Sequence, residues 1–540
     1  MLLSITDLSF LLYYFAVSGI IWLDDSKKAV SGLFSRLKSV GLFGIESYMI
    51  EVEADVSTGL PAFDIVGLPD TAVKESRDRV RAAVKNCGFK FPVGRITVNL
   101  APADLKKEGS IYDLPVLIAI LKASGQLKAT LDDSIFVGEL SLDGKTRRTG
   151  GVLAIAITAL KNGIKNVFVP SENAAEAAVI EGLNVYGVED VKQLIDHITG
   201  KKPLEKTPKT EIAPEQYATA LDFSEVKGQL AAKKALEIAA AGGHNILLIG
   251  PPGSGKSMLA KRLPTILPEM TFDESIETTK IHSIAGILDP KNPFVNTRPF
   301  RSPHHTVSVA GLTGGGSVPR PGEISLAHNG VLFLDELPEF RRDVMEAMRQ
   351  PLEDGTVTIS RVAGTLTYPS SVMLVAAMNP CPCGFYGHPT KECICSQNAV
   401  RKYLNRISGP MLDRIDIHVE VPPVNYAELS SNAKEETSAE IRERVNKARK
   451  IQQERYRGTS VTCNARLTPS MLKKHCILDP AASSYLQQSF DKLGMSARAY
   501  DRILKVARTV ADLEGSEIIK KQHIFSAISF RTLDRKYWME

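Results

Sequence analysis

Short apolar runs and amphipathic segments alternate along the first third of the chain. Three runs have the alternating or wholly apolar pattern of strands, at residues 48–56, 96–100 and 167–169. Residues 70–86 instead carry three valines on one helical face among many charges, namely Val73, Val80 and Val84. This mixture predicts an α+β domain over residues 34–200.

The pattern changes twice further along the chain. Residues 201–220 contain three prolines and no apolar period, which predicts a linker. Residues 221–425 again combine apolar strands with amphipathic helices, as expected of a second α/β domain. Residues 426–540 lose the strand signals and show helical periods, so they predict a helical C-terminal domain.

The N-terminal residues 1–33 contain an apolar stretch at residues 8–23. Its 16 residues fall short of the roughly 20 that cross a bilayer. No Lys or Arg precedes it and no small-residue cleavage site follows, so it is not typical of a signal peptide. A membrane anchor, a surface-packing helix and an extension outside the functional protein are alternatives. We expect the extension, and no membrane partner.

Composition excludes several classes of protein. Of 540 residues, 44% are hydrophobic and 24% charged, which excludes a collagen or a disordered tail. The net charge of +5 permits an anionic partner such as nucleic acid without arguing for one. Seven cysteines are too few for a secreted disulfide scaffold, which favours a reducing compartment, the cytoplasm.

A phosphate-binding loop is the clearest chemical motif. Residues 250–257 fit G-x-x-x-x-G-K-[ST], follow an apolar strand at 246–249 and precede an apolar-periodic helix. The motif consists of Gly250, Pro251, Pro252, Gly253, Ser254, Gly255, Lys256 and Ser257. In such a loop the lysine reaches the β- and γ-phosphates and the serine hydroxyl binds Mg²⁺. We therefore predict ATP and Mg²⁺ as cofactors.

Polar residues follow two later apolar strands. Asp335 and Glu336 directly follow the apolar run 331–334. Asp335 is suited to hold Mg²⁺, and Glu336 is suited to activate the attacking water. Residues 372–378 end in Asn379, which could orient that water, although an Asn before Pro380 is also a common turn residue.

Two arginines could stabilise charge on the transferred phosphate. Arg414 lies in residues 412–418, and Arg498 lies in residues 494–500. Ordinary ion pairs are the alternative reading of both. The partners would be Asp413 or Asp416 for the first arginine and Asp501 for the second.

A cysteine cluster follows Asn379. It consists of Cys381, Cys383, Cys393 and Cys395. Two thiolate pairs joined by a turn-rich loop could close a tetrahedral Zn²⁺ site, with His388 as a substitute for one thiol. The C-x-C spacing is tighter than the commoner C-x-x-C, so four reduced thiols in a surface loop are the alternative. We favour a structural zinc that braces the loop after the strand.

Taken together, these motifs resemble those of AAA+ ATPases. More narrowly, the chain is similar to the magnesium-chelatase-like YifB/ComM family from about residue 34 onward, on the stretches 59–70, 301–306 and 314–328. The resemblance implies an α/β fold with an AAA+ P-loop core, a helical lid and a Lon-protease-like N-terminal domain. It also implies Asn379 as sensor 1, Arg414 as a finger acting on a neighbour, Arg498 as the sensor-2 arginine, and a ring, usually a hexamer.

The N-terminal domain is expected to lack protease chemistry. Residues 107–115 occupy the stretch in which Lon carries its nucleophilic serine, and Ile111 takes the serine position in a gapless reading. Ser110 is one residue early, which would aim its hydroxyl elsewhere. A Ser–Lys pair needs both groups within hydrogen-bond reach. We predict a non-catalytic binding or assembly module.

The resemblance implies a motor that moves along DNA, as in branch migration or unwinding during recombination or natural transformation. Residues 356–368 predict a β-hairpin, from which Arg361 could touch a phosphate backbone, and residues 441–457 form a helix with seven Lys or Arg. Solvated charges are the alternative for both. An ATP-switched assembly or chaperone-like subunit is the second hypothesis, and an ATP-dependent protease the third. No role for His304, His305 or glycines 314–316 follows from the sequence.

Overall fold

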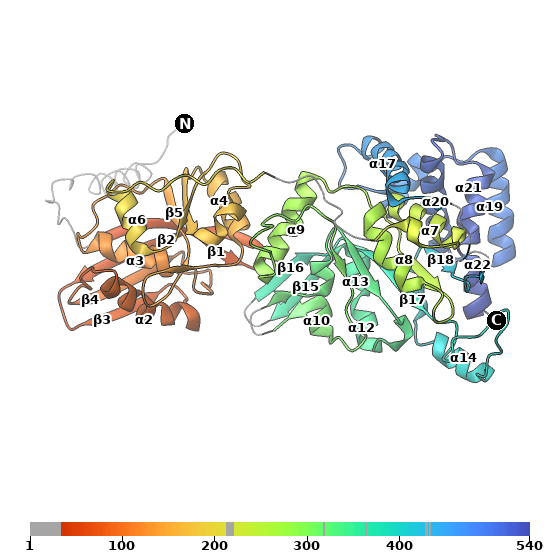
Figure 1. The fold of residues 1–540 in the computed structure, drawn as a ribbon, viewed down its shortest axis with the longest axis horizontal. Coiled ribbons are helices and arrows are strands. Elements are labelled where there is room, and N and C mark those ends of the chain that lie inside the picture. The colour runs from red at the N-terminus through yellow and green to blue at the C-terminus, as the bar shows by residue number, and fades with distance from the viewer. Residues whose placement is uncertain are drawn as a thin grey trace, which may run out of the picture.

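The computed structural model describes residues 34–211, 221–316, 319–361, 364–426, 430 and 434–539 (Figure 1). The expected extension at 1–33, with its apolar stretch, lies outside these residues. Figure 1 shows three regions in a row: an N-terminal region with one sheet, a central region with a second sheet, and a helical C-terminal region. Across the described ranges, no helix is both long enough and apolar enough to cross a membrane.

The N-terminal region is built on a mixed sheet. Its described strands lie in the order β3-β4-β2-β1-β5-β8-β9. They are β1 (Phe34–Phe43), β2 (Glu46–Ser57), β3 (Ala62–Val66), β4 (Arg95–Ala101), β5 (Ser134–Phe136), β8 (Asn166–Pro170) and β9 (Asn184–Val188), beside a ribbon of β6 (Glu139–Leu140) and β7 (Thr146–Arg147). The helices are α2 (Thr71–Asn86), α3 (Asp113–Ala123), α4 (Val152–Lys161), α5 (Ala174–Ala177) and α6 (Val191–Ile198). The three predicted strands fall in β2, β4 and β8, which confirms the α+β character.

Helix α2 shows why the spaced valines form a helix. The carboxylate of Asp70 caps the first turn by accepting a hydrogen bond from the Val73 amide at 2.7 Å. Val73, Val80 and Val84 are fully buried on one side, while the charged residues face outward. Burial of each such side chain contributes about 1.5–3 kcal/mol, so packing rather than helix propensity decides this element.

The central region carries a parallel sheet. Its described strands lie in the order β11-β14-β17-β10-β18, and all neighbours run parallel. They are β10 (Ile246–Ile249), β11 (Phe300–Arg301), β14 (Val331–Leu334), β17 (Met373–Met378) and β18 (Ile417–Glu420). Every residue of β10, β14 and β17 is buried, as expected of parallel strands covered on both faces. The predicted α/β core is confirmed.

Helices and two small ribbons surround this sheet. The helices are α7 (Leu230–Gly242), α8 (Lys256–Arg262), α9 (Phe272–Ala285), α10 (Val309–Thr313), α11 (Glu323–Leu326), α12 (Arg342–Ala347), α13 (Arg349–Asp354), α14 (Gln397–Leu404) and α15 (Gly409–Leu412). The ribbons pair β12 (Gly314–Gly315) with β13 (Arg320–Pro321), and β15 (Thr356–Arg361) with β16 (Gly364–Pro369). The second ribbon is the predicted hairpin. Its two closing residues, 362 and 363, lie outside the described ranges.

The C-terminal region is helical, as predicted. It contains α17 (Ser438–Arg455), α18 (Pro469–His475), α19 (Pro480–Leu493), α20 (Ala497–Leu513), α21 (Lys521–Ser529) and α22 (Thr532–Asp534), and it ends in a π-helical turn at Arg535–Met539. Helices α17 and α20 pack on α7, and one continuous hydrophobic core joins them to β10, β17 and β18. The lid therefore shares its core with one face of the sheet.

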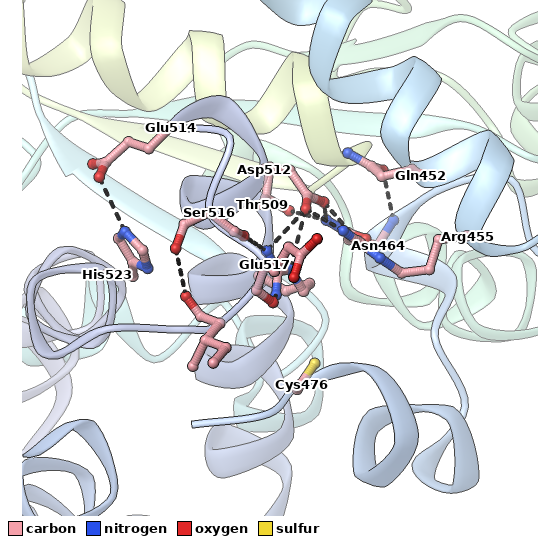
Figure 2. A network of polar contacts seen from close by, with 12 residues as sticks. Gln452, Arg455, Asn464, Cys476, Thr509, Asp512, Glu514, Ser516, Glu517 and His523 are labelled. Atoms are coloured by element: carbon pink, nitrogen blue, oxygen red, sulfur yellow. Dashed lines mark hydrogen bonds and ion pairs between the residues drawn. The ribbon is translucent and has the colours of Figure 1, made fainter. Parts of the chain in front are cut away.

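A buried polar network stabilises this lid. Figure 2 shows Asp512 at its centre, where the carboxylate accepts hydrogen bonds from Arg455 at 2.6 and 2.9 Å and from Asn464 at 2.8 Å. Arg508, fully buried, also binds Asp512. Because buried charges are costly without partners, this network fixes how α17 meets α20.

The N-terminal region docks on the central region through α9, which contacts α4, and through the hairpin, whose Leu366 lies against Gly44 (Figure 1). Ser283, near the end of α9, accepts a hydrogen bond from the Gly151 amide at 2.7 Å and donates one to the buried carboxylate of Glu176. Leu153 and Phe294 meet in a small apolar cluster across the same junction. The contact between the two regions is thus both apolar and polar.

The described part of the predicted linker, residues 201–211, has no helix or strand. It nevertheless lies against the N-terminal region: the Thr207 amide donates to the Val185 carbonyl at 2.8 Å, and the Thr210 amide donates to the Ala178 carbonyl at 3.2 Å. This segment therefore belongs physically to the surface of the N-terminal region.

Candidate nucleotide site

The predicted phosphate-binding loop joins β10 to α8. Gly253 and Gly255 adopt φ values of +77° and +93°, a left-handed conformation that glycine reaches without strain. A Cβ added at Gly250 would stand 2.2 Å from the Val421 carbonyl oxygen, so the loop passes close to the strand end after β18. The glycines of the motif are therefore required by backbone geometry.

Two contacts join this loop to the neighbouring strand ends. The Lys256 ammonium donates to the carbonyls of Gly250 and Pro251 at 2.7 and 2.9 Å and to Asn379 Oδ1 at 3.2 Å. The Ser257 hydroxyl donates to Asp335 Oδ2 at 2.7 Å. Four predicted site residues from three parts of the chain therefore meet at the carboxyl edge of the sheet, where ligands bind in open α/β folds.

Burial shapes the electrostatics of this cluster. It lowers the pKa of Lys256 to about 8, against the opposing influence of the Asp335 and Glu336 charges. The ammonium is held by protein oxygens that cannot neutralise it fully. An anionic phosphate would be a better partner, so the site is electrostatically suited to a nucleotide tail.

Glu336 stands at the same edge with its carboxylate largely in solvent. Its backbone is left-handed, with φ +54° and ψ +49°, and its side chain is 58% exposed. His305 Nδ1 lies 3.8 Å from its Oε2. The His305 ring lies 4.0 Å from the His304 ring, tilted by 35°, and meets Phe340 edge-on. His305 thus lies beside the predicted base. His305 was not predicted from the sequence. It follows β11, which pairs in parallel with β14, but a strand of two residues is too short to be recognised from an apolar period.

Arg414 and Arg498 lie at the opposite, amino edge of the sheet. The Arg414 carbonyl accepts a hydrogen bond from Asn245, which immediately precedes β10, at 2.8 Å. Both arginines line one cavity of about 420 Å³, together with Arg466, Arg502 and Lys505. The sheet therefore separates them from the phosphate-binding loop of their own chain.

The ion pairs of these arginines differ from the alternatives considered above. Arg414 pairs with Glu353 of α13 and donates to the Arg349 carbonyl at 3.1 Å, rather than pairing with Asp413 or Asp416. Arg498 lies 3.4 Å from Asp413, and not beside Asp501, with 69% of its side chain exposed. The suggested ion-pair partners were wrong because they were inferred from proximity in the sequence, whereas the observed partners are brought close by the packing of helices.

The four predicted cysteines converge. Sulfur atoms of the first three lie 3.4–3.6 Å apart, and all four lie within 4.8 Å of one another. Four ligands around a Zn²⁺ at 2.3 Å would place sulfurs about 3.8 Å apart, so the donor set fits this metal. His388 is engaged elsewhere, because its Nδ1 accepts hydrogen bonds from the amides of Thr390 and Lys391. The four-cysteine set is therefore a complete tetrahedral donor set without this histidine.

Comparison with known proteins assigns the chain to a family. Three family models match: "Magnesium chelatase, subunit ChlI" over residues 222–429, "Subunit ChlI of Mg-chelatase" over 52–173, and "Magnesium chelatase, subunit ChlI C-terminal" over 435–531. YifB of Salmonella typhimurium, described as uncharacterized, is 45% identical over 494 residues, covering 91% of this chain and 96% of that protein. The competence protein ComM of Haemophilus influenzae is also 45% identical, over 501 residues and the same shares.

The chain belongs to the YifB/ComM family of magnesium-chelatase-like AAA+ proteins. Part of it is also similar to Lon protease 2 of Bacillus subtilis, with 30% identity over 148 residues, 25% of this chain and 26% of that protein. The AAA+ core and the Lon-like N-terminal region expected from the sequence are thus both supported by relatives.

In this chain, the side chains of residues 107–115, the stretch that corresponds to the serine region of Lon, make structural contacts. The Ser110 hydroxyl donates to the Glu139 carboxylate, and Ile111 is buried in the core. The Lys107 ammonium is buried and donates to the carbonyls of Leu105, at 2.7 Å, and Pro102. Ser110 and Lys107 therefore do not form a Ser–Lys pair with each other.

The basic side chains of helix α17 are largely engaged with other groups of the same chain, in the central region and in the helical C-terminal region. Five of its six Lys and Arg side chains bind protein groups: Arg442, Arg444, Lys447, Arg449 and Arg455. Arg444, for example, holds Glu237 of α7 at 2.6 Å. These side chains are paired with protein groups rather than only solvated, which favours a structural interpretation of the helix over a DNA contact.

Proposed function

We propose that this protein binds Mg-ATP at the carboxyl edge of its central sheet and hydrolyses it there. The observation that carries the proposal is the pair of contacts Lys256–Asn379 and Ser257–Asp335 beside a glycine-rich loop. Ser257 and Asp335 would hold Mg²⁺, which neutralises phosphate charge when bound. Lys256 binds the phosphates, and Glu336 accepts the proton of the attacking water.

Two further residues prepare the water. Asn379 Oδ1 already lies at hydrogen-bond distance from Lys256, so the same side chain can orient a water beside the terminal phosphate. His305 faces the Glu336 carboxylate and restricts where it points. Both are positioning groups, since neither is required to exchange a proton.

The hydrolytic site is completed by a second copy of the chain. Arg414 and Arg498 line one cavity at the amino edge, on the far side of the sheet from their own loop, so they serve a neighbour's nucleotide. A closed ring of copies gives every loop such a neighbour, and six is the usual number in AAA+ rings. We place this ring in the cytoplasm.

The substrate that the ring acts on is DNA. The printed name of the Haemophilus relative, a competence protein, and the hairpin β15–β16 support this choice. The decisive measurement is the ATPase rate of purified protein with single-stranded, duplex and four-way-junction DNA. Stimulation by one of these supports a DNA motor, whereas ATP hydrolysis that no DNA changes would contradict it.

An ATP-switched assembly subunit is the second candidate. The match of all three regions to models of magnesium chelatase subunit ChlI favours it. Such a protein would hydrolyse ATP without a DNA response and would change its affinity for a protein partner with nucleotide state. An ATP-dependent protease is disfavoured by the contacts of Ser110 and Lys107.

The cysteine cluster holds a structural Zn²⁺ in this proposal. The convergence of four sulfur atoms within 4.8 Å supports it. Protein purified under reducing, chelator-free conditions is expected to carry about one zinc per chain, measured by elemental analysis. A preparation without zinc would contradict this assignment.

A further inference from the structure

The cysteine loop lies directly against the phosphate-binding loop. Gly384, one residue after Cys383, is buried and adopts φ +85°. A Cβ added there would stand 2.5 Å from Pro252 Cδ and 3.1 Å from Pro252 Cγ. Glycine is therefore the residue that lets the two loops touch at this point.

The same loop begins at the predicted water-orienting residue. Asn379, which accepts from Lys256 at 3.2 Å, precedes Cys381 by two positions. Cys381 is fully buried in the core formed by the sheet and its flanking helices. One short stretch therefore touches the phosphate-binding loop twice, at Lys256 through Asn379 and at Pro252 through Gly384.

The cysteine loop has no regular secondary structure to fix its shape, although Cys381 is buried and Tyr386 packs against the core. Residues 380–396 contain no helix or strand, and their stretch from Cys383 to Cys395 is mostly exposed or half-buried. A metal that joins two cysteine pairs from the two ends of such a segment removes much of its conformational freedom. The position of Gly384 is consequently tied to whether the sulfur atoms are held together.

We propose that Zn²⁺ on the four cysteines controls nucleotide affinity, because the closed loop presses on Pro252 and keeps the phosphate-binding loop in its binding conformation. This inference rests on the proposed nucleotide site. It adds that the zinc is a positioning element for ATP and that Gly384 is the point of transmission.

The first test separates the contact from the metal. In Gly384→Ala the four cysteines are intact, so the protein keeps its zinc, but the new methyl group meets Pro252. We expect ATP to bind about tenfold more weakly, measured by equilibrium titration with a slowly hydrolysed analogue. Gly387→Ala is the matched control: its φ is +73°, and a Cβ there would meet nothing nearer than Lys536 Nζ at 4.0 Å.

Equal affinities of Gly384→Ala, Gly387→Ala and the unaltered protein would overturn the inference. A loss shared by both variants would also overturn it, since backbone strain anywhere in the loop would then suffice. Zinc is measured in each preparation, and circular dichroism checks that the chain is folded.

The second test removes the metal from the unaltered protein. Treatment with a chelator selective for Zn²⁺ over Mg²⁺, followed by desalting, should weaken analogue binding about tenfold, and added Zn²⁺ should restore it. Cys395→Ser should behave like the stripped protein, while Cys87→Ser, outside the cluster, should not.

The two proposals fail in different ways. If the zinc-loaded protein does not bind the analogue at all, the nucleotide site itself is wrong. If it binds equally well with and without zinc, the nucleotide site stands and only the zinc dependence is refuted.

Discussion

At the carboxyl edge of the central sheet, side chains from three parts of one chain meet around the phosphate-binding loop. At the amino edge, two arginines with predicted roles in the same reaction line a cavity that has no such loop. The first edge holds the groups proposed to bind the nucleotide and activate water, whereas the second edge holds the two arginines and no phosphate-binding loop. Under the proposed function, the contrast predicts that these arginines complete the site of a neighbouring copy.

The largest effect is expected at the amino edge. Arg414→Ala should leave ATP binding intact and reduce hydrolysis on the order of 10³-fold, as for arginine fingers supplied in trans. Binding and steady-state ATPase rates are measured separately. Arg341→Ala, which removes an exposed arginine paired with Asp343, is the control and should change neither.

Mixed rings test whether the arginine crosses between subunits. Rings assembled from Arg414→Ala and Lys256→Ala chains contain some interfaces with an intact loop and an intact arginine. Their ATPase activity should exceed that of either parent. Co-assembled rings as inactive as both parents would show that the arginine acts within its own chain.

The next effect sharpens the contrast at the carboxyl edge. Glu336→Gln should keep ATP bound and lower turnover about 10²-fold or more, since a neutral amide cannot take the water's proton. Lys256→Ala should instead weaken ATP binding, because it removes a phosphate contact present before reaction. Near-normal turnover of the Glu336 variant would contradict its role as base.

Solution pH should act on nucleotide binding at the carboxyl edge. The pKa of Lys256 is about 8 before binding, and bound phosphates would raise it, so binding above pH 8 requires uptake of a proton. ATP affinity should therefore fall as pH rises from 8 to 9, by at most about tenfold per pH unit. Lys256→Arg, whose guanidinium does not titrate there, should give a flatter profile. Parallel profiles for both proteins would rule out this lysine as the titrating group.

The smallest effect is expected from a change in the orientation of the Glu336 carboxylate. His305→Ala should lower turnover about fivefold without changing ATP affinity, because it removes the ring that faces the carboxylate. His304→Ala is the neighbouring control, since the imidazole of His304 binds Thr306 instead, at 2.9 Å. Identical turnover numbers for these two variants would remove His305 from the site.

Patterns within short continuous segments were enough to predict the central sheet and the residues at its carboxyl edge. Strands β10, β14 and β17 are uninterrupted apolar runs, and a parallel sheet brings their polar ends together, so the meeting of Lys256 with Asn379, 123 positions away, follows from topology. Contacts that depend on how helices pack together have no comparable pattern in the sequence. Glu353 reaches Arg414 because α13 packs there, and the contact of Gly384 with Pro252 depends on how a loop without periodic structure folds back.

The junction at Ser283 has a consequence for the covalent path between the two sheets. Glu176, Gly151 and Leu153 contact α9 and Phe294 directly, so the two regions are joined by non-covalent contacts as well as by the peptide connection. We therefore expect the two fragments of a polypeptide cut after residue 211 to stay associated. A displacement of α9 would be passed to the N-terminal region through Ser283, without passing along the chain between the two sheets.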